Sequence, residues 1–120
     1  MNLLKILNLI RLNGGVTYNL STGETNPDDG YMVSLEKHGF VSHFVAPDIV
    51  RDYLKEKAHL LTQSNRYFGV WNNGTDYVFD VSEKVDSLEV ALFLGRQRKQ
   101  LAIWDNVHKD EIKIGYEKSI

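Results

Sequence analysis

Two acidic residues and a lysine near the end of the chain have the spacing of a catalytic group. Asp105 is followed by Glu111 and Lys113 in an Asp…Glu-x-Lys pattern. In a metal-dependent nuclease, paired carboxylates bind Mg²⁺ through oxygen ligands, and a lysine stabilises or activates the attacking water. Asp80 joins the group if its strand lies beside the strand that ends at Asp105. A nuclease is therefore one alternative function for this chain.

The same residues also fit an ordinary surface. A Glu-x-Lys triplet is typical of the solvated side of a strand, and Asp105 followed by Asn106 is typical of a turn. The chain has no cysteine, no G-x-S-x-G motif and no glycine-rich phosphate loop, and no two histidines have the spacing of a metal-binding pair. The histidines are His38, His43, His59 and His108. We therefore expect a protein that is not an enzyme, with no metal site and no cofactor.

A second alternative is a nucleic-acid-binding module. Arg96, Arg98 and Lys99 form a small basic cluster, and a sheet with exposed aromatic residues could stack bases. The chain as a whole has a net charge of −2 and a pI near 6.1, however, so it lacks the electrostatic attraction that dominates such binding. The cluster is also what the end of a helix favours, because cations are stabilised there.

Large aromatic residues are concentrated in one short stretch. This stretch contains Tyr67, Phe68, Trp71, Tyr77 and Phe79. One face of the predicted hairpin must join the core, and the other is either covered by a helix or exposed to a protein partner, where Trp and Tyr are frequent anchors. We expect Trp71, Tyr67 and Tyr77 to contribute to such a binding surface.

The beginning of the chain has the pattern of an amphipathic helix over residues 2–12. Four apolar residues share one stripe, whereas Leu4, Leu9 and Leu12 fall outside it. These leucines predict that the helix is covered on more than one side, either by a packed hairpin or by another subunit. Leu9 is therefore added to the predicted partner surface, and self-association is the alternative to an unidentified protein partner.

Length and composition predict one self-sufficient core. The 120 residues are 42% apolar and 25% charged, which fits a single globular domain and excludes an acidic disordered tail. We assign residues 1–120 to one domain, with an N-terminal helix at 1–13 and a sheet-and-helix body at 14–120. The N-terminal apolar run has no cleavage site and is shorter than the roughly 20 residues that span a bilayer. We therefore expect a cytoplasmic protein without membrane contact.

Hydrophobic periodicity predicts an α+β fold with an antiparallel or mixed sheet and its helices on one face. After the first helix, the expected order is β-β-β-α-β-β-α-β-β. The expected strands cover residues 16–20, 31–35, 40–45, 67–71, 77–81, 101–105 and 111–114, and the expected helices cover 47–62 and 87–98.

Three local features support this order. Asn73-Gly74 between two aromatic runs is a strong hairpin signal, and Asp86 followed by Glu89 has the spacing of a helix cap. Lys37-His38-Gly39 predicts a turn. The stretch 31–61 and the stretch 67–98 share a strand–strand–helix order, which suggests a degenerate ββα repeat.

Several strand and turn segments resemble those of known proteins. The segments are 15–24, 30–35, 67–71, 77–82 and 101–105. Together they resemble small uncharacterised proteins of bacteriophages and conjugative elements, over about residues 14–120. The resemblance implies an accessory protein in the host bacterial cell that binds and inhibits a host defence or regulatory protein without catalysis. Protein–protein binding is therefore the leading functional interpretation.

Overall fold

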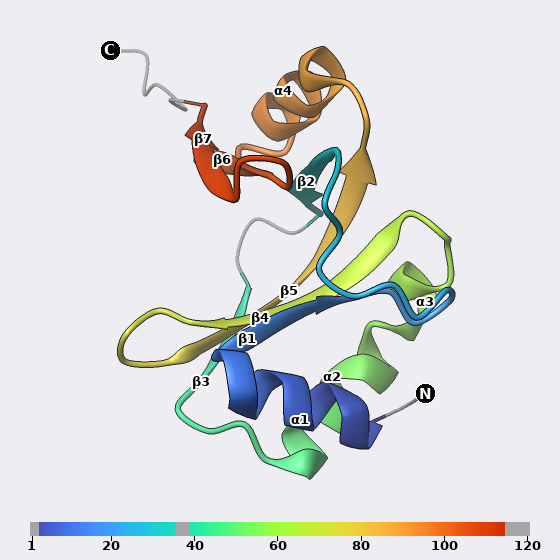
Figure 1. Ribbon diagram of the computed structural model, residues 1–120, viewed down its shortest axis with the longest axis vertical. Helices are drawn as coiled ribbons and strands as arrows, with labels where there is room; N and C mark the ends of the chain where they lie inside the picture. Colours follow the sequence, from blue (N-terminus) through green and yellow to red (C-terminus); the bar gives the residue numbers. More distant parts are fainter. Residues whose placement is uncertain (1–2, 36–38, 115–120) are drawn as a thin grey trace.

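The computed structural model describes residues 3–35 and 39–114 (Figure 1). The helices are α1 (Leu3–Asn13), α2 (Pro47–Glu56), α3 (Ala58–Leu61) and α4 (Leu88–Gln97). The strands are β1 (Gly15–Tyr18), β2 (Tyr31–Ser34), β3 (Phe40–Ser42), β4 (Arg66–Asn72), β5 (Tyr77–Val85), β6 (Ala102–Asp105) and β7 (Asp110–Lys113). The α+β fold and the predicted order of elements are confirmed, except that a break at Lys57 divides the second helix into α2 and α3.

The strands form one antiparallel sheet in the order β1-β4-β5-β2-β6-β7, with β3 also paired to β5. The β4–β5 hairpin lies at its centre and is the most extensively paired unit. Its loop follows the predicted chemistry, because Gly74 has a φ of 104° and the Asn73 side chain accepts hydrogen bonds from the backbone of Thr75 and Asp76.

Strands β2 and β3 do not form a hairpin with each other. Both pair antiparallel with β5, along the edge that β4 leaves unoccupied, and so they run in the same direction. The two halves of the predicted ββα repeat therefore share the order of their elements but not the pairing of their strands. In the second half β4 and β5 form a hairpin, whereas in the first half β2 and β3 do not pair with each other. The turn predicted at Lys37-His38-Gly39 lies mostly outside the described residues.

One face of the sheet carries the core. Cross-strand partners point to the same side, and Val16↔Val70, Phe68↔Val81 and Val70↔Phe79 are such pairs. These side chains are buried against α1, α2 and α3, which cover this part of the sheet (Figure 1). The buried residues of α1 are Ile6 and Ile10, as the helical stripe predicts.

Helix α4 covers the other end of the same face. Val33 is opposite Glu83, two residues from Val81, so it points to the core side. It packs with Ala91 of α4 and Ile103 of β6 in a second cluster. All four helices of the described residues thus lie on one face of the sheet, which confirms the prediction.

The cap of α4 differs from the predicted one. Ser87 is the N-cap residue, and its hydroxyl accepts a hydrogen bond from the Val90 N–H at 3.3 Å. The predicted capping by Asp86 is therefore wrong by one residue. Leu88 is 41% exposed, because Ala91 and Gly95 form the side of α4 that contacts the sheet.

No helix among the described residues is both long enough and apolar enough to cross a bilayer.

Candidate functional site

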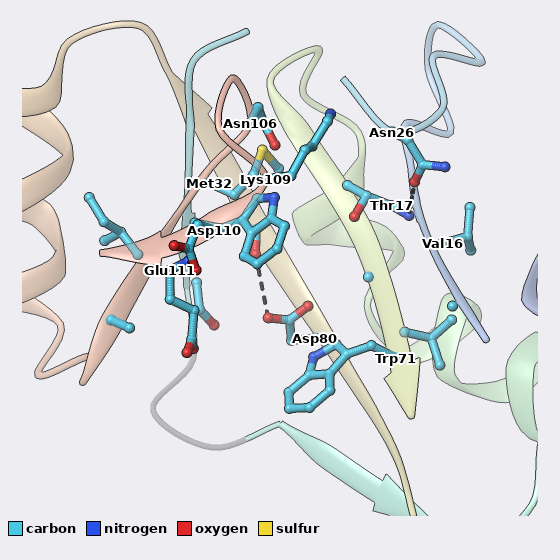
Figure 2. Close-up of a pocket in the computed structure, with 18 of the residues that line it drawn as sticks. Val16, Thr17, Asn26, Met32, Trp71, Asp80, Asn106, Lys109, Asp110 and Glu111 are labelled. Atoms are coloured by element: carbon cyan, nitrogen blue, oxygen red, sulfur yellow. Dashed lines mark hydrogen bonds between the residues drawn. The ribbon is translucent and has the colours of Figure 1, made fainter. Parts of the chain in front are cut away.

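The face of the sheet opposite the helices contains a half-open cleft of about 1320 Å³ (Figure 2). Strands β4 and β5 provide one side of it, and the β6–β7 hairpin provides the other. The residues that matter most for its chemistry are Trp71, Asp80, Ser82, Lys99, Trp104, Lys109, Asp110 and Glu111. The cleft exists because the sheet is twisted and because its helices all lie on the other face.

Two tryptophans border the cleft. Trp71 is 50% exposed and Trp104 is 40% exposed, although both belong to strands with buried neighbours. Alternation explains this, because Val70 and Ile103 point into the core and each following residue points to the opposite face. The register places Glu111 directly opposite Trp104 on the same face. An exposed indole on each side of a cleft is an arrangement typical of binding surfaces.

The floor of the cleft holds a half-buried carboxylate. Asp80 of β5 is opposite Gly69 of β4, and a side chain at position 69 would place its Cβ 2.5 Å from the Asp80 Oδ1. Glycine at position 69 therefore allows the carboxylate to lie close to the strand. The Ser82 hydroxyl donates a long hydrogen bond of 3.4 Å to Asp80. Figure 2 shows Trp71, Asp80 and Glu111 projecting from three different strands into the cleft.

The cleft is lined by residues of both charges. Its lining residues include the acidic Asp80, Asp110 and Glu111 and the basic Lys99 and Lys109, and the register places Asp110 on the side of Asp105. The Lys109 ammonium is directed to the loop that precedes β2, where it donates to the Pro27 carbonyl at 3.0 Å and to the Asp28 carboxylate at 3.1 Å.

The loop between β1 and β2 is attached to the β6–β7 turn. The Asn106 side chain donates to the Asp29 carbonyl at 2.8 Å, and Lys84 forms an ion pair with the Asp29 carboxylate at 2.6 Å. The hydrogen bond between the Lys84 ammonium and the Asp29 carboxylate lowers the pKa of Asp29 and raises the pKa of Lys84. These contacts position one end of the cleft.

Tyr67 does not belong to the exposed surface that the sequence predicts. Only 3% of it is exposed, because the loop before β2 covers it and its hydroxyl donates a hydrogen bond to Glu24. Burial raises the pKa of Tyr67, and the Glu24 hydrogen bond acts in the same direction. The prediction that Tyr67 contributes to an exposed binding surface is therefore wrong.

Tyr77 and Leu9 contribute to the core more than to a surface. Both are half-buried and pack against the cluster under β4 and β5. Tyr77 is two residues from Phe79 and so points to the helix-covered face, opposite Trp71. On α1, the leucines that remain exposed are Leu4, at 70%, and Leu12, at 74%. Of the four residues predicted to bind a partner, Trp71 alone lines the cleft.

The residues of the nuclease alternative are divided between the two faces of the sheet. Glu111 is paired with Trp104 and Lys113 with Ala102, whereas Asp105 is paired with Asp110 and points to the other side. Asp80 and Glu111 both line the cleft, whereas Asp105 does not. Among the described residues no group of three or more His, Asp or Glu side chains could hold a metal ion.

Asp105 instead stabilises the turn between β6 and β7. Its carboxylate accepts hydrogen bonds from the backbone N–H groups of Val107 and His108 and contacts the His108 ring at 2.7 Å. The hydrogen bond with the ring lowers the pKa of Asp105, and the two backbone donors add to this effect. The alternative view of Asp105-Asn106 as turn residues is therefore confirmed.

The three basic residues of the nucleic-acid alternative do not form one surface. Arg98 is directed to Glu83, with 2.7 Å between its Nη2 and the carboxylate, and most of both side chains is buried. Arg96 and Lys99 remain exposed. Lys99 has a φ of 57° and follows the end of α4, where its N–H donates to Arg96 and that of Gln100 donates to Gly95.

Trp104 lines the cleft and was not predicted from the sequence to bind a partner. The sequence feature that could have identified Trp104 is its position directly after the buried Ile103 in a short strand. Alternation then places the large indole on the side opposite the core. Comparison of the chain with protein-family models, curated proteins and solved structures found no match.

Proposed function

We propose that this protein acts by binding another protein through the cleft on the open face of its sheet. The observation that carries the proposal is the pair of exposed indoles, Trp71 and Trp104, on opposite sides of one cleft. Exposed tryptophans beside a concave surface supply large apolar contact area and are frequent hot spots in protein interfaces.

The position of the cleft supports this proposal. It lies on the face of the sheet opposite α1, α2, α3 and α4, and its shape depends on contacts between the β1–β2 loop and the β6–β7 turn, such as those of Lys109 and Asn106. These side-chain contacts restrain the β6–β7 hairpin, which forms one side of the cleft. A preformed surface binds with a smaller loss of conformational entropy.

The resemblance to small phage and mobile-element proteins suggests where to look for the partner. We propose that the protein is an accessory protein that binds a host defence or regulatory protein, so a bacterial lysate is the appropriate source. Catalysis is not part of this proposal.

The test compares three immobilised forms of the full chain in a bacterial lysate: the unchanged protein, Trp71→Ala and Phe93→Ala. Phe93 is a matched control, because it is 63% exposed on α4 and lies outside the cleft. We expect one or more proteins to be retained by the unchanged chain and by Phe93→Ala, and to be lost with Trp71→Ala. Equal retention by all three forms, or no retained protein, would contradict the proposal.

A further inference from the structure

Strand β7 is an edge of the sheet (Figure 1), and within residues 3–35 and 39–114 it pairs with β6 alone. We propose that this edge binds the same strand of a second copy of the chain. In the antiparallel pair, Glu111 of each copy lies opposite Lys113 of the other. The inference goes beyond the proposed function, because it concerns the edge of the sheet and not the contacts of Trp71 in the cleft.

The direction of the backbone groups of β7 is the first argument. The Ile114 N–H donates to the Leu101 carbonyl at 3.0 Å, and the register of β6 with β7 continues this pairing. In an antiparallel ladder, pairs that exchange hydrogen bonds alternate with pairs that do not. Glu111 and Lys113 therefore direct their N–H and C=O groups away from β6. These are the groups with which a further strand pairs.

The Asp110 carboxylate occupies one of these outward groups. It accepts a hydrogen bond from the Glu111 N–H at 2.8 Å, and Asp110 is exposed. A second strand replaces this contact with a hydrogen bond from the same N–H to the Lys113 carbonyl of the other copy. The exchange conserves the number of hydrogen bonds at Glu111, so it costs little.

The charge pattern of β7 is the second argument, because it selects one register. An antiparallel pair centred on Ile112 places each Glu111 opposite a Lys113. Pairs centred on Glu111 or on Lys113 place like charges opposite each other, which is destabilising. In the described part of the chain both side chains are exposed and take part in none of the ion pairs, so they are available to a second copy.

The other side of β7 supplies apolar contact. Ile112 and Ile114 are half-buried and lie at the margin of the cluster that contains Ile103 and Ala91. In the proposed pair, Ile112 of one copy lies opposite Ile112 of the other on the helix-covered face. The second copy thus covers apolar surface that β7 leaves partly exposed, and this burial adds to the backbone hydrogen bonds.

The opposite edge of the sheet is closed by the chain itself. Strand β1 forms that edge, where the Asn26 N–H donates to the Thr17 carbonyl at 2.8 Å and the Asn26 side chain accepts from the Thr17 N–H at 3.0 Å. The β1–β2 loop therefore satisfies outward groups of β1. No described residue does the same for the backbone of Lys113. This difference favours β7 over β1 as the edge that accepts a second copy.

The proposed dimer also places two clefts on one surface. Cross-strand partners point to the same side of a sheet, and Glu111 lines the cleft. Lys113 of the second copy therefore lies at the border of the first cleft, and the reverse holds by symmetry. A partner protein would meet two copies of the cleft on one continuous sheet.

Sedimentation velocity of the full chain, from about 1 µM to about 1 mM, measures the dimerisation. We expect a monomer–dimer equilibrium with a Kd of about 100 µM, because a contact between single strands is at the low end of interface sizes. Glu111→Lys and Lys113→Glu each replace both pairs of unlike charges with pairs of like charges. Each variant alone should raise the Kd by about tenfold or more.

An equimolar mixture of these two variants is the decisive sample. The basic strand of one variant then lies opposite the acidic strand of the other, so the mixture should form a dimer with about the original Kd. Its recovery also shows that both variants are folded. Glu56→Lys and Lys55→Glu are matched controls, because they make the same charge changes at exposed positions of α2. Each should leave the Kd within about twofold.

A chain that stays monomeric up to about 1 mM would overturn the inference. So would a mixture that is no more dimeric than its two components, or an equal loss of dimer with the α2 variants. Trp71→Ala should leave the dimer unchanged, and its loss in that variant would place the contact in the cleft and overturn the inference. Because retention from a lysate and dimerisation are measured separately, either proposal can fail while the other stands.

Discussion

The carboxylate of Asp80 lies against the backbone of Gly69, its cross-strand partner in the β4–β5 hairpin. A Cβ at position 69 would come within 2.5 Å of the Asp80 Oδ1, which is closer than side chains approach in proteins. The glycine therefore makes room for the acidic group on the floor of the cleft. This relationship links a backbone requirement of the sheet to the chemistry of the candidate binding site.

Gly69→Ala should destabilise the protein by about 1–3 kcal/mol, because the new methyl group forces the Asp80 carboxylate to move. In an Asp80→Ala background the same change should be neutral or slightly stabilising, since alanine restricts the unfolded chain more than glycine does. Urea unfolding of the four forms gives the coupling free energy, expected at about 0.5–3 kcal/mol. Additive effects of the two substitutions would show that the close approach does not exist.

Gly95→Ala should also be destabilising, by about 1–3 kcal/mol, through overpacking. A Cβ on this helical residue would overlap the Cδ1 of Ile114 and lie 3.0 Å from the Cγ2 of Ile103. Ile114→Val removes the Cδ1 atom, so the cost of Gly95→Ala should fall in that background. Thermal or urea unfolding measures the difference. Glu89→Ala, on the exposed side of the same helix, is the control and should change stability by no more than about 0.5 kcal/mol. An equal cost of Gly95→Ala in both backgrounds would contradict the packing of α4 on Ile114, the residue after β7.

Tyr67 should make stability fall at alkaline pH. Its pKa in the folded protein is raised above the ordinary value of 10.0, chiefly by burial and then by the Glu24 hydrogen bond. The unfolded chain therefore loses the tyrosine proton first as pH rises, so the contribution of Tyr67 is complete below about pH 10 and is lost as pH rises through the folded-state pKa. The urea midpoint should fall between pH 8 and pH 11, and Tyr67→Phe should reduce that fall. Tyr77→Phe serves as the control, and an identical pH dependence of Tyr67→Phe and the unchanged protein would exclude this role.

Asp105 should titrate below its ordinary value of 3.8, because the His108 ring and two backbone N–H groups stabilise its carboxylate. A group with a lowered folded-state pKa contributes stability above its unfolded pKa and loses it as pH falls through the folded value. NMR titration of the side-chain carboxyl carbon should therefore show a midpoint under 3.8. His108→Ala should move the midpoint upward towards that value. A midpoint at or above 3.8 in the unchanged protein would contradict the turn contacts.

Local sequence determined most of the elements. The Asn73-Gly74 turn, the alternation around Phe68 and Val81 and the helical stripe of Ile6 and Ile10 each depend on residues close together in the chain, so periodicity and turn chemistry were sufficient to predict them. Boundaries were less predictable. The break at Lys57 and the Ser87 cap depend on how each helix end packs, which periodicity does not describe.

The candidate site was decided by the tertiary structure. Alternation shows that Trp104 and Asp105 point to opposite sides, but only the pairing of β6 with β7 shows that Glu111 shares the face of Trp104 and not that of Asp105. Likewise, Tyr67 and Trp71 share a face of β4, yet the distant loop that carries Glu24 covers Tyr67 and leaves Trp71 exposed. The sequence by itself determined which side of its own strand each residue faces. The neighbours of each strand, and the loops and helices that cover each face, depend on contacts between distant parts of the chain, and these contacts created the cleft.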